Sequence, residues 1–314
     1  MVIGTNAFSA DPARHWQRGK IAITGGHLAF HRTGGFGQTL VLAHGLTDNG
    51  LCWTRVAVAL QDEYDIVMLD ARGHGESSRI AQGAASDRAR DIAQGAASDR
   101  ARNIAQGAAS DRARDIAQGA ASDPACDIAQ AIAALGLRSP VVMGHSIGAL
   151  AIATFASANP AVASKIILED PPFLPIPSRS KSLERKRMFR QQVKEFQRMS
   201  DAEIHALGRQ LSPGWHEDDF PAWTLGKQQV DPAAMPERLA PWQDAVAGIT
   251  VPTLMICGDT KRGGLVSRAV AAEAMRINRN IRSVTIEAAG HNIHREQFAA
   301  FITHVRAFLK HDGH

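Results

Sequence analysis

The sequence contains few of the residues on which several protein classes depend. Of its 314 residues, 3 are cysteines and 1 is a tyrosine, and Phe, Trp and Tyr together make up 5%. The three cysteines lie far apart in the chain, so they exclude a disulfide framework and a cysteine-based zinc site. Sparse, unpaired cysteines are typical of a reducing compartment, and we therefore predict a cytoplasmic protein without a metal site.

The sequence also lacks a strong excess of either charge and any long apolar run. Its formal net charge of +4 is spread along the chain, and aromatic residues for base stacking are scarce, so we expect no nucleic-acid partner. No apolar run reaches membrane-spanning length, and the first residues lack the apolar core of a signal peptide. We expect no membrane partner, and either a monomer or a homodimer.

What the sequence has in abundance is one 12-residue phrase, which begins IAQGAASD and occurs four times between residues 80 and 127. On one continuous helix, the first isoleucine of each copy would be rotated by about 120° about the helix axis from the first isoleucine of the preceding copy, so these residues would form no single apolar stripe. Each copy also contains a glycine followed by Ser-Asp, a helix breaker and then a helix N-cap. The unit is too short for the helix pairs of solenoids. We predict a tandem duplication that lengthens one surface connection, with an oligomerisation or partner-binding arm as the alternative.

Outside the repeat, strand and helix patterns alternate along the chain. Apolar runs predict buried parallel strands at 39–43, 65–70, 140–143, 165–169, 252–259 and 283–290. Helical periodicity is present at 51–60, 128–137, 148–158, 267–277 and 296–310, and residues 20–31 have the pattern of a hairpin. Such alternation is typical of an α/β fold with a mostly parallel central sheet flanked by helices.

The alternation is interrupted once, between residues 172 and 240, where the sequence is charged and helical in character without a strand pattern. We therefore predict a core formed by residues 1–171 and 241–314, with residues 172–240 inserted as a helical lid. Within the lid, residues 179–198 carry eight basic and two acidic side chains. We expect a solvated helix face there; the alternative is a positive rim that attracts an anionic substrate.

The strongest chemical motif is Gly144-His145-Ser146-Ile147-Gly148, a G-x-S-x-G pattern between an apolar strand and an apolar helix. A sharp strand-to-helix turn strains the Ser146 backbone and projects its hydroxyl above the sheet, and it needs glycines where side chains would collide. We predict that Ser146 is a nucleophile. The amide of Ile147, at the start of the helix, is expected to hold a developing oxyanion. The alternative is a glycine-rich packing turn.

A second oxyanion donor is expected after the predicted strand at 39–43. His44-Gly45 follows this strand, and the glycine allows the chain to turn back so that the amide of Leu46 lies beside Ser146. An ordinary turn at the end of a strand is the plainer interpretation.

Five segments together resemble the α/β-hydrolase superfamily, in that family's order: LVLAHGL at 40–46, DARGHGESS at 70–78, GHSIGA at 144–149, PTLMICGD at 252–259 and AAGHNIH at 288–294. The likeness covers nearly all of the chain outside the repeat and the lid. It implies an α/β-hydrolase fold and an enzyme of the serine esterase type, with an acid and then a histidine in loops after later strands. A weaker likeness links the chain to xenobiotic ester hydrolases such as monoalkyl phthalate hydrolases.

The resemblance indicates His291 as the general base, in a turn after a predicted strand, where a neutral imidazole can take the serine proton. His294 is the nearest competitor. For the acid that orients His291, the resemblance favours Asp259. Asp170, at the end of the preceding predicted strand, is the alternative, and Glu169 is a more distant one.

Five other residues are weighed as parts of a site. Asp70 and Arg72, in the glycine-rich turn DARGHGESS, are expected to be structural, with a tight turn and an ion pair that hold the connection. His145, Trp215 and Trp223 are the candidate residues of a substrate pocket. For the two tryptophans, simple packing within the lid is the alternative.

These expectations predict a serine hydrolase that cleaves a small-molecule carboxylic ester through an acyl-enzyme and needs no metal or organic cofactor. The basic lid and the family likeness favour a carboxylate-bearing ester, such as a monoalkyl phthalate. Two alternatives stay open: a C–C bond hydrolase of vinylogous diketones with the same serine, histidine and acid, and a non-catalytic ligand receptor. Dehalogenase and epoxide hydrolase activities are not expected, because relatives with those activities carry Asp in place of Ser146.

Overall fold

A computed structural model describes residues 15–80, 123–235 and 241–310 of the chain. Within these ranges, eight strands form one sheet in the order β1-β2-β4-β3-β5-β6-β7-β8. The pairs β1-β2 and β2-β4 are antiparallel, and every other neighbouring pair is parallel. The strands are β1 (Gln17–Ile23), β2 (Gly26–Arg32), β3 (Thr39–Ala43), β4 (Asp65–Leu69), β5 (Val141–His145), β6 (Lys165–Glu169), β7 (Thr253–Gly258) and β8 (Ile281–Ile286). The predicted α/β class with a mostly parallel central sheet is confirmed.

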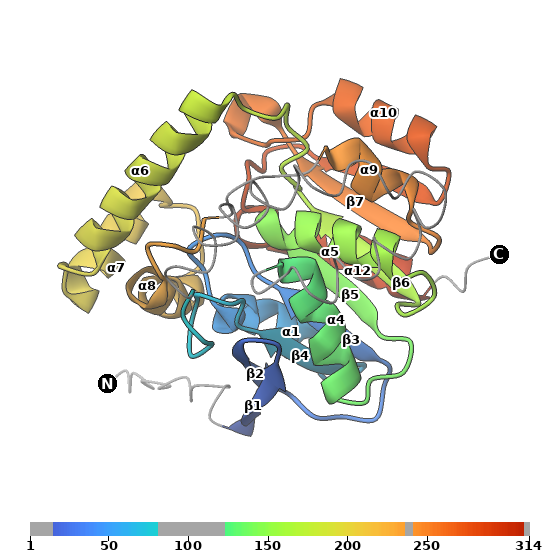
Figure 1. Ribbon diagram of the computed structural model, residues 1–314, viewed down its shortest axis with the longest axis horizontal. Coiled ribbons are helices and arrows are strands. Elements are labelled where there is room, and N and C mark those ends of the chain that lie inside the picture. Colours follow the sequence, from blue (N-terminus) through green and yellow to red (C-terminus); the bar gives the residue numbers. More distant parts are fainter. Residues whose placement is uncertain (1–14, 81–122, 236–240, 311–314) are drawn as a thin grey trace, which may run out of the picture.

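Helices cover both faces of this sheet (Figure 1). Every residue of β4 and of β5 is buried, as expected for parallel strands that helices cover on both sides. Val41 of β3 joins a hydrophobic cluster with α4, α5, α9 and α10, whereas Leu40 and Leu42 join a second cluster with α1 and α12. The core helices are α1 (Thr54–Leu60), α4 (Pro124–Ala134), α5 (Ile147–Ala158), α9 (Trp242–Ala247), α10 (Arg268–Ile277), α11 (Ile293–Glu296) and α12 (Phe298–Lys310).

The described part of the predicted lid, residues 172–235, contains three α-helices and no strand. These helices are α6 (Arg179–Phe196), α7 (Asp201–Leu211) and α8 (Phe220–Gln229), and they lie beside the core at the left of Figure 1. Where the chain enters the lid, the ring of Phe173 stacks on Trp242 of α9 with centroids 4.8 Å apart. Across the described residues, no helix combines the length and the apolar character that a membrane crossing requires.

Most of the tandem repeat, residues 81–122, lies outside the described residues, so its predicted role as a surface extension stays a prediction. The end of its last copy is described and starts α4. Asp123 is the N-cap, and its carboxylate accepts the Ala125 amide at 2.9 Å. Pro124, which replaces the arginine of the other copies, takes the first helical position, where a missing N–H costs nothing.

Asp70 and Arg72 make structural contacts, and the ion pair expected in this turn is formed by Arg72. Arg72 forms a buried, two-pronged ion pair with Asp127 of α4, at 2.8 and 3.1 Å. The carboxylate of Asp70 accepts the Gly50 amide at 2.7 Å and the Glu76 amide at 2.8 Å. The turn after β4 is thus tied both to the turn after β3 and to the helix that follows the repeat.

Candidate active site

Ser146 occupies a strained turn between β5 and α5. Its backbone has φ 55° and ψ −123°, a conformation that non-glycine residues rarely adopt. A Cβ at Gly144 would lie 2.6 Å from Cδ1 of Ile152, and a Cβ at Gly148 would lie 2.5 Å from the His44 carbonyl oxygen. Side chains at these two positions would collide with their surroundings, so both glycines are required for the strand-turn-helix geometry that the motif predicts.

The turn after β3 packs against Ser146. A Cβ at Gly45 would lie 2.7 Å from Nδ1 of His145 and 3.5 Å from Cβ of Ser146, so glycine brings the backbone of the turn close to the serine. His44 fixes the shape of the turn. Its Nδ1 donates to the Gly45 carbonyl at 2.7 Å, and its Nε2 accepts the Ala71 amide at 3.0 Å.

The two predicted oxyanion donors lie where these turns meet. Ile147 is the first residue of α5, where an amide has no acceptor within its own helix. Leu46 belongs to the turn formed by residues 44–48, which we call the 44–48 turn, and it packs against a small cluster formed by Phe189, Val193 and Val230. Ile147 directly follows Ser146 and Leu46 directly follows Gly45, which packs against Ser146. The role of both amides as oxyanion donors stays a prediction.

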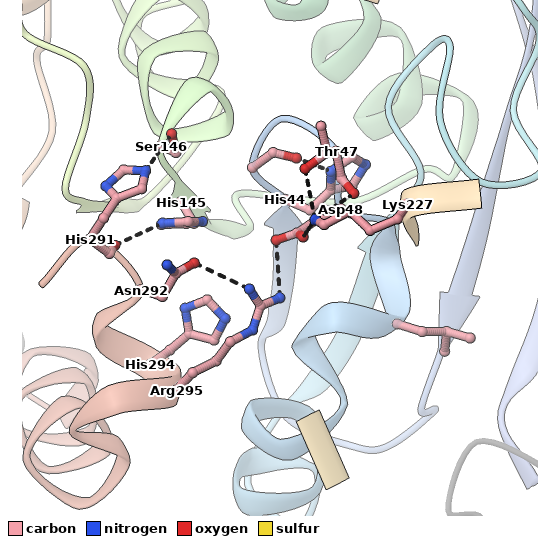
Figure 2. A network of polar contacts seen from close by, with 12 residues as sticks. His44, Thr47, Asp48, His145, Ser146, Lys227, His291, Asn292, His294 and Arg295 are labelled. Carbon is pink, nitrogen blue, oxygen red and sulfur yellow. Dashed lines mark hydrogen bonds and ion pairs between the residues drawn. The ribbon is translucent and has the colours of Figure 1, made fainter. Parts of the chain in front are cut away.

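His291 lies between Ser146 and a buried carboxylate. Its Nε2 is 2.9 Å from Oγ of Ser146 (Figure 2), and its Nδ1 is 2.7 Å from Oδ2 of Asp170. When Nδ1 donates its proton to Asp170, Nε2 is left to accept the serine proton. The His291 side chain is 28% exposed and that of Asp170 is 0% exposed, so the ring is accessible from solvent while its orienting partner is not.

The predicted contact between Asp259 and His291 is not formed, and we correct the orienting acid to Asp170. Asp259 follows β7 and caps the short 3-10 helix η4 (Thr260–Arg262), where its carboxylate accepts the Lys261 amide at 2.9 Å. Both aspartates directly follow parallel strands, so both lie at the same edge of the sheet. Asp170 is the nearer partner because β6, which it follows, lies next to β5, the strand that ends at the serine turn.

Backbone amides hold the Asp170 carboxylate toward His291. The Leu265 amide donates to Oδ2 at 2.8 Å, and the Val266 amide donates to Oδ1 at 3.3 Å. Both amides come from the loop after β7, which turns back through Gly263 at φ 102°. Asp170 itself has φ 40°, in the left-handed region that aspartate tolerates better than most residues. The loop that holds Asp259 thus serves to fix Asp170.

A second acid and histidine pair lies behind the first. Nδ1 of His294 is 2.9 Å from both carboxylate oxygens of Glu169, and the His294 amide donates to the same carboxylate at 2.9 Å. Burial lowers the pKa of His294 to about 3 and raises the pKa of Glu169 to about 7. His294, the competing base, is therefore a neutral buried residue, and the ring that contacts Ser146 is that of His291.

His145 supports the His291 loop from the buried side. Its ring is 3% exposed and lies between His291 and His294, with centroid distances of 4.7 and 5.3 Å. Its Nε2 donates to the His291 carbonyl at 2.9 Å (Figure 2). Burial lowers the pKa of His145 to about 3. The prediction that His145 lines the substrate pocket is therefore corrected, because a buried ring with this bond faces the protein interior.

Glu296 is a supporting residue that the sequence does not reveal. Its carboxylate accepts the amides of Gly290 and Asn292, which flank His291 on either side, and the Asn292 bond measures 3.0 Å. These bonds hold the peptide on which the base is carried. The signal in the sequence is one carboxylate shortly after Gly-His, a spacing too common to single out a residue.

Trp215 and Trp223 pack within the lid and over buried cations. Their ring centroids are 6.2 Å apart. Nζ of Lys227 lies 4.6 Å from the Trp223 ring centre, and the Arg295 guanidinium carbon lies 4.6 Å from that of Trp215. These contacts give both tryptophans a packing role, and their contact with a substrate stays a prediction.

A buried group of three charged residues lies next to the site, and the sequence analysis predicts none of them. Asp48 of the 44–48 turn forms ion pairs with Lys227 at 3.2 Å and with Arg295 at 3.0 Å. Lys227 belongs to α8 and Arg295 to α11, so the group joins the turn, the lid and the segment after His291 (Figure 2). All three side chains are at most 7% exposed.

The cations of residues 179–198 lie on the solvent side of α6. The buried residues of this helix are Phe189, Val193 and Phe196. Arg190 and Arg198 are exposed and take part in lining a surface hollow of about 570 Å³ along the helix. This is the solvated face that the sequence predicts, and its action on an anionic substrate stays a prediction.

Known proteins share parts of this sequence. A family model described as the alpha/beta hydrolase family matches residues 40–303. A fluoroacetate dehalogenase from Burkholderia sp. is 48% identical over 46 residues. That match spans 15% of this chain and 15% of the dehalogenase, so the chain shares only a short segment with this relative.

Solved structures share the fold over almost the whole chain. E-2-(acetamidomethylene)succinate hydrolase has a TM-score of 0.67 at 18% identity, covering 95% of this chain and 100% of that chain. The esterase RhEst1 from Rhodococcus sp. ECU1013 has a TM-score of 0.67 at 19% identity, with coverage of 95% and 100%. The N-formylmaleamic acid deformylase of Pseudomonas putida S16 has a TM-score of 0.63 at 20% identity, covering 92% of this chain and 100% of that chain. Identities this low show a common fold alone. The family model, however, spans most of the sequence, and the chain belongs to the alpha/beta hydrolase family.

Proposed function

We propose that this protein is a serine hydrolase that cleaves a carboxylic ester through an acyl-enzyme. The observation that carries the proposal is the continuous chain of contacts from Oγ of Ser146 through the His291 ring to Asp170, at 2.9 and 2.7 Å. A hydroxyl, an imidazole and a buried carboxylate in this order are what acyl transfer by a serine requires.

In the proposed reaction, Oγ of Ser146 attacks the acyl carbon while its proton passes to Nε2 of His291. The amides of Leu46 and Ile147 hold the negative charge that develops on the carbonyl oxygen. The tetrahedral intermediate collapses, the C–O bond to the alcohol breaks, and His291 protonates the leaving oxygen. Water then gives a proton to Nε2 of His291 as its oxygen attacks the acyl-enzyme. When the second tetrahedral intermediate collapses, the ester bond to Ser146 breaks, His291 returns the proton to Oγ, and the acid is released. Asp170 stabilises the imidazolium in both halves.

For the substrate we favour an ester that bears a carboxylate, such as a monoalkyl phthalate. The exposed cations of α6, among them Arg190 and Arg198, place positive charge on the lid, which favours the approach of anions. Fluoroacetate, acetamidomethylenesuccinate and N-formylmaleamic acid, the compounds named for the similar proteins, all carry a carboxyl group.

Displacement of a halide by Ser146 is not favoured by its chemistry. Attack of a serine oxygen on a saturated carbon would form an ether, which water does not cleave, whereas attack on an acyl carbon forms an ester that water clears. The serine and histidine also suit a C–C bond hydrolase of vinylogous diketones, and a ligand receptor on the same scaffold is the non-enzymatic alternative.

A p-nitrophenyl ester series with the Ser146→Ala variant as control tests the proposal. We expect turnover that the substitution lowers on the order of 10⁶-fold, and fluorophosphonate labelling that peptide mapping places on Ser146. Cleavage of a vinylogous diketone without ester turnover would support the C–C hydrolase. Ligand binding without turnover or labelling would support the receptor.

The carboxylate preference has a separate test. At 0.1 M salt and above, the Debye screening length is about 10 Å or less, so the attraction between the lid cations and a distant anion is weakened. Added salt should therefore raise KM for a monoalkyl phthalate and leave KM for a neutral ester of similar size unchanged. An equal response of both substrates would remove the carboxylate preference and leave the esterase proposal intact.

A further inference from the structure

Lys227 of the lid helix α8 reaches the turn that is expected to carry an oxyanion donor. Its Nζ donates to the Thr47 carbonyl at 3.0 Å, to Oγ1 of Thr47 at 2.7 Å and to Oδ1 of Asp48 at 3.2 Å. These three acceptors use all three protons of the ammonium group. Both acceptor residues belong to the 44–48 turn and directly follow Leu46.

The backbone of α8 also sits closely on this turn. A Cβ at Gly226 would lie 3.1 Å from the Thr47 carbonyl oxygen and 3.2 Å from Cα of Asp48. Thr47 has φ 69°, in the left-handed region that a threonine adopts only when its surroundings hold it there. The residue after Leu46 is therefore in a strained conformation, and the contacts that hold it include those of the lid helix.

Asp48 extends the connection to the segment that carries the base. Its second oxygen, Oδ2, accepts from Nη2 of Arg295 at 3.0 Å, and Nη1 of Arg295 donates to Oδ1 of Asn292 at 3.2 Å. Asn292 is the residue directly after His291. One carboxylate thus joins the lid, the 44–48 turn and the His291 loop (Figure 2).

Asp48, Lys227 and Arg295 depend on one another because all three charges are buried. Burial by itself would raise the Asp48 pKa, but the positive charges around the carboxylate, those of Arg295 and Lys227 foremost, together lower it. Neutralising Lys227 would leave the Asp48 carboxylate with only one of its two cationic partners. Loss of a partner from a buried ion pair strongly destabilises the folded state, because it leaves a buried charge uncompensated. The position of Thr47 and Asp48 relative to α8 is therefore closely fixed.

We propose that Lys227 is a positioning residue, which through Thr47 and Asp48 fixes the turn bearing the Leu46 amide, so that the oxyanion pocket is complete only when the lid helix α8 is seated. The proposal rests on the esterase function proposed above. Lys227 acts on the transition state through the turn and touches no reacting atom. Its loss should therefore lower kcat and leave KM nearly unchanged, because the oxyanion exists only after attack has begun.

The test compares Lys227→Met with the control Arg55→Met in the full-length protein. Arg55 of α1 forms another lid-to-core ion pair, with Asp219 at 2.6 Å; the Arg55 side chain is 19% exposed, and this pair does not include a residue of the 44–48 turn. We expect Lys227→Met to lower kcat for a p-nitrophenyl ester by on the order of 10- to 100-fold, with KM within about threefold, and to slow fluorophosphonate labelling of Ser146 in parallel. Arg55→Met should keep both rates, and the Tm of each variant shows whether it is folded.

Lys227→Met with wild-type kcat would overturn the inference, and so would an equal loss of kcat in Arg55→Met. If Lys227→Met does not fold, Lys227→Gln, which keeps a hydrogen-bond donor without the charge, takes its place under the same two outcomes. Failure of the proposed function looks different: the wild-type protein would then neither hydrolyse the esters nor react with the fluorophosphonate.

Discussion

His291 and Asp170 lie 121 positions apart in the chain, and Nδ1 of one is 2.7 Å from Oδ2 of the other. The whole lid is inserted between them. The contact exists because β6 and β8 end at the same edge of the sheet and the loop after β7 folds back to hold the carboxylate. The orienting acid is therefore separated from the lid region by a single core residue, Pro171.

Substitution of this acid should separate the two aspartates. We expect Asp170→Asn to lower kcat for an ester about 10³- to 10⁴-fold, because an amide neither stabilises the imidazolium nor selects the productive tautomer. Asp259→Asn should change kcat by less than about threefold, because asparagine caps a helix as well as aspartate does. Steady-state kinetics at matched Tm measure both, and a larger loss in Asp259→Asn would restore the acid predicted from the sequence.

The buried His145 makes stability depend on pH. Its pKa is lowered to about 3 in the folded protein, from 6.5. Between these values the unfolded chain binds a proton that the folded protein does not, so the stability present above pH 6.5 is lost as the pH falls toward 3. His145→Gln keeps a donor for the His291 carbonyl and cannot titrate. The free energy of unfolding, measured with urea at several acidic pH values, should therefore fall less steeply in the variant, by up to about 1.4 kcal/mol per pH unit; parallel profiles would contradict the role of His145.

Gly148 should not tolerate a methyl group. A Cβ there would lie 2.5 Å from the His44 carbonyl oxygen and 2.6 Å from that of Ala43, and neither strand-end carbonyl is free to move. We expect Gly148→Ala to reduce the free energy of unfolding by about 3 kcal/mol or more and to abolish labelling of Ser146. Gly214→Ala is the control, because nothing lies within 4 Å of the added atom, and it should change stability by less than about 0.5 kcal/mol. Equal stability of the two variants would show that the turn is less tightly packed than described.

The Arg72–Asp127 pair, whose side chains are each 5% exposed, should be costly to break from one side. Arg72→Met leaves the Asp127 carboxylate buried without its cation, and we expect a loss of about 3–5 kcal/mol in urea unfolding. The double variant Arg72→Met/Asp127→Leu removes both charges and should recover most of that loss. Arg72 also donates to the carbonyls of Thr24 at 2.8 Å and Gly25 at 3.1 Å. A double variant no more stable than the single one would mean that these hydrogen bonds, rather than the charge of Arg72, hold the turn.

The sequence predicts the strands of the sheet well, because a buried strand is marked by apolar residues within its own short segment. The apolar runs at 39–43 and 165–169 coincide with β3 and β6, since a strand covered on both faces is apolar throughout. The helix expected at 128–137 begins earlier, at Pro124. Its start depends on the capping side chain of Asp123 and on proline at the first turn, which override the apolar periodicity.

The site is predictable only where a local motif specifies it. Ser146 follows from its glycines and His291 from a turn after a strand, because both depend on nearby backbone geometry. The choice of Asp170 over Asp259 depends on how a distant loop folds back, which no spacing records. The pairing of Asp48 with Lys227 joins residues 179 positions apart, and in the sequence each looks like an ordinary surface charge.

The stacked rings of Phe173 and Trp242 have a mechanical consequence. Their contact joins the segment where the chain leaves the core for the lid to the segment where it returns to the core. Pro171 and Pro172, whose rings restrict rotation of the backbone, fill the short stretch between this contact and Asp170. Any displacement of α6 to α8 would thus be absorbed outside the stacked rings, and the carboxylate that orients the imidazole would keep its place.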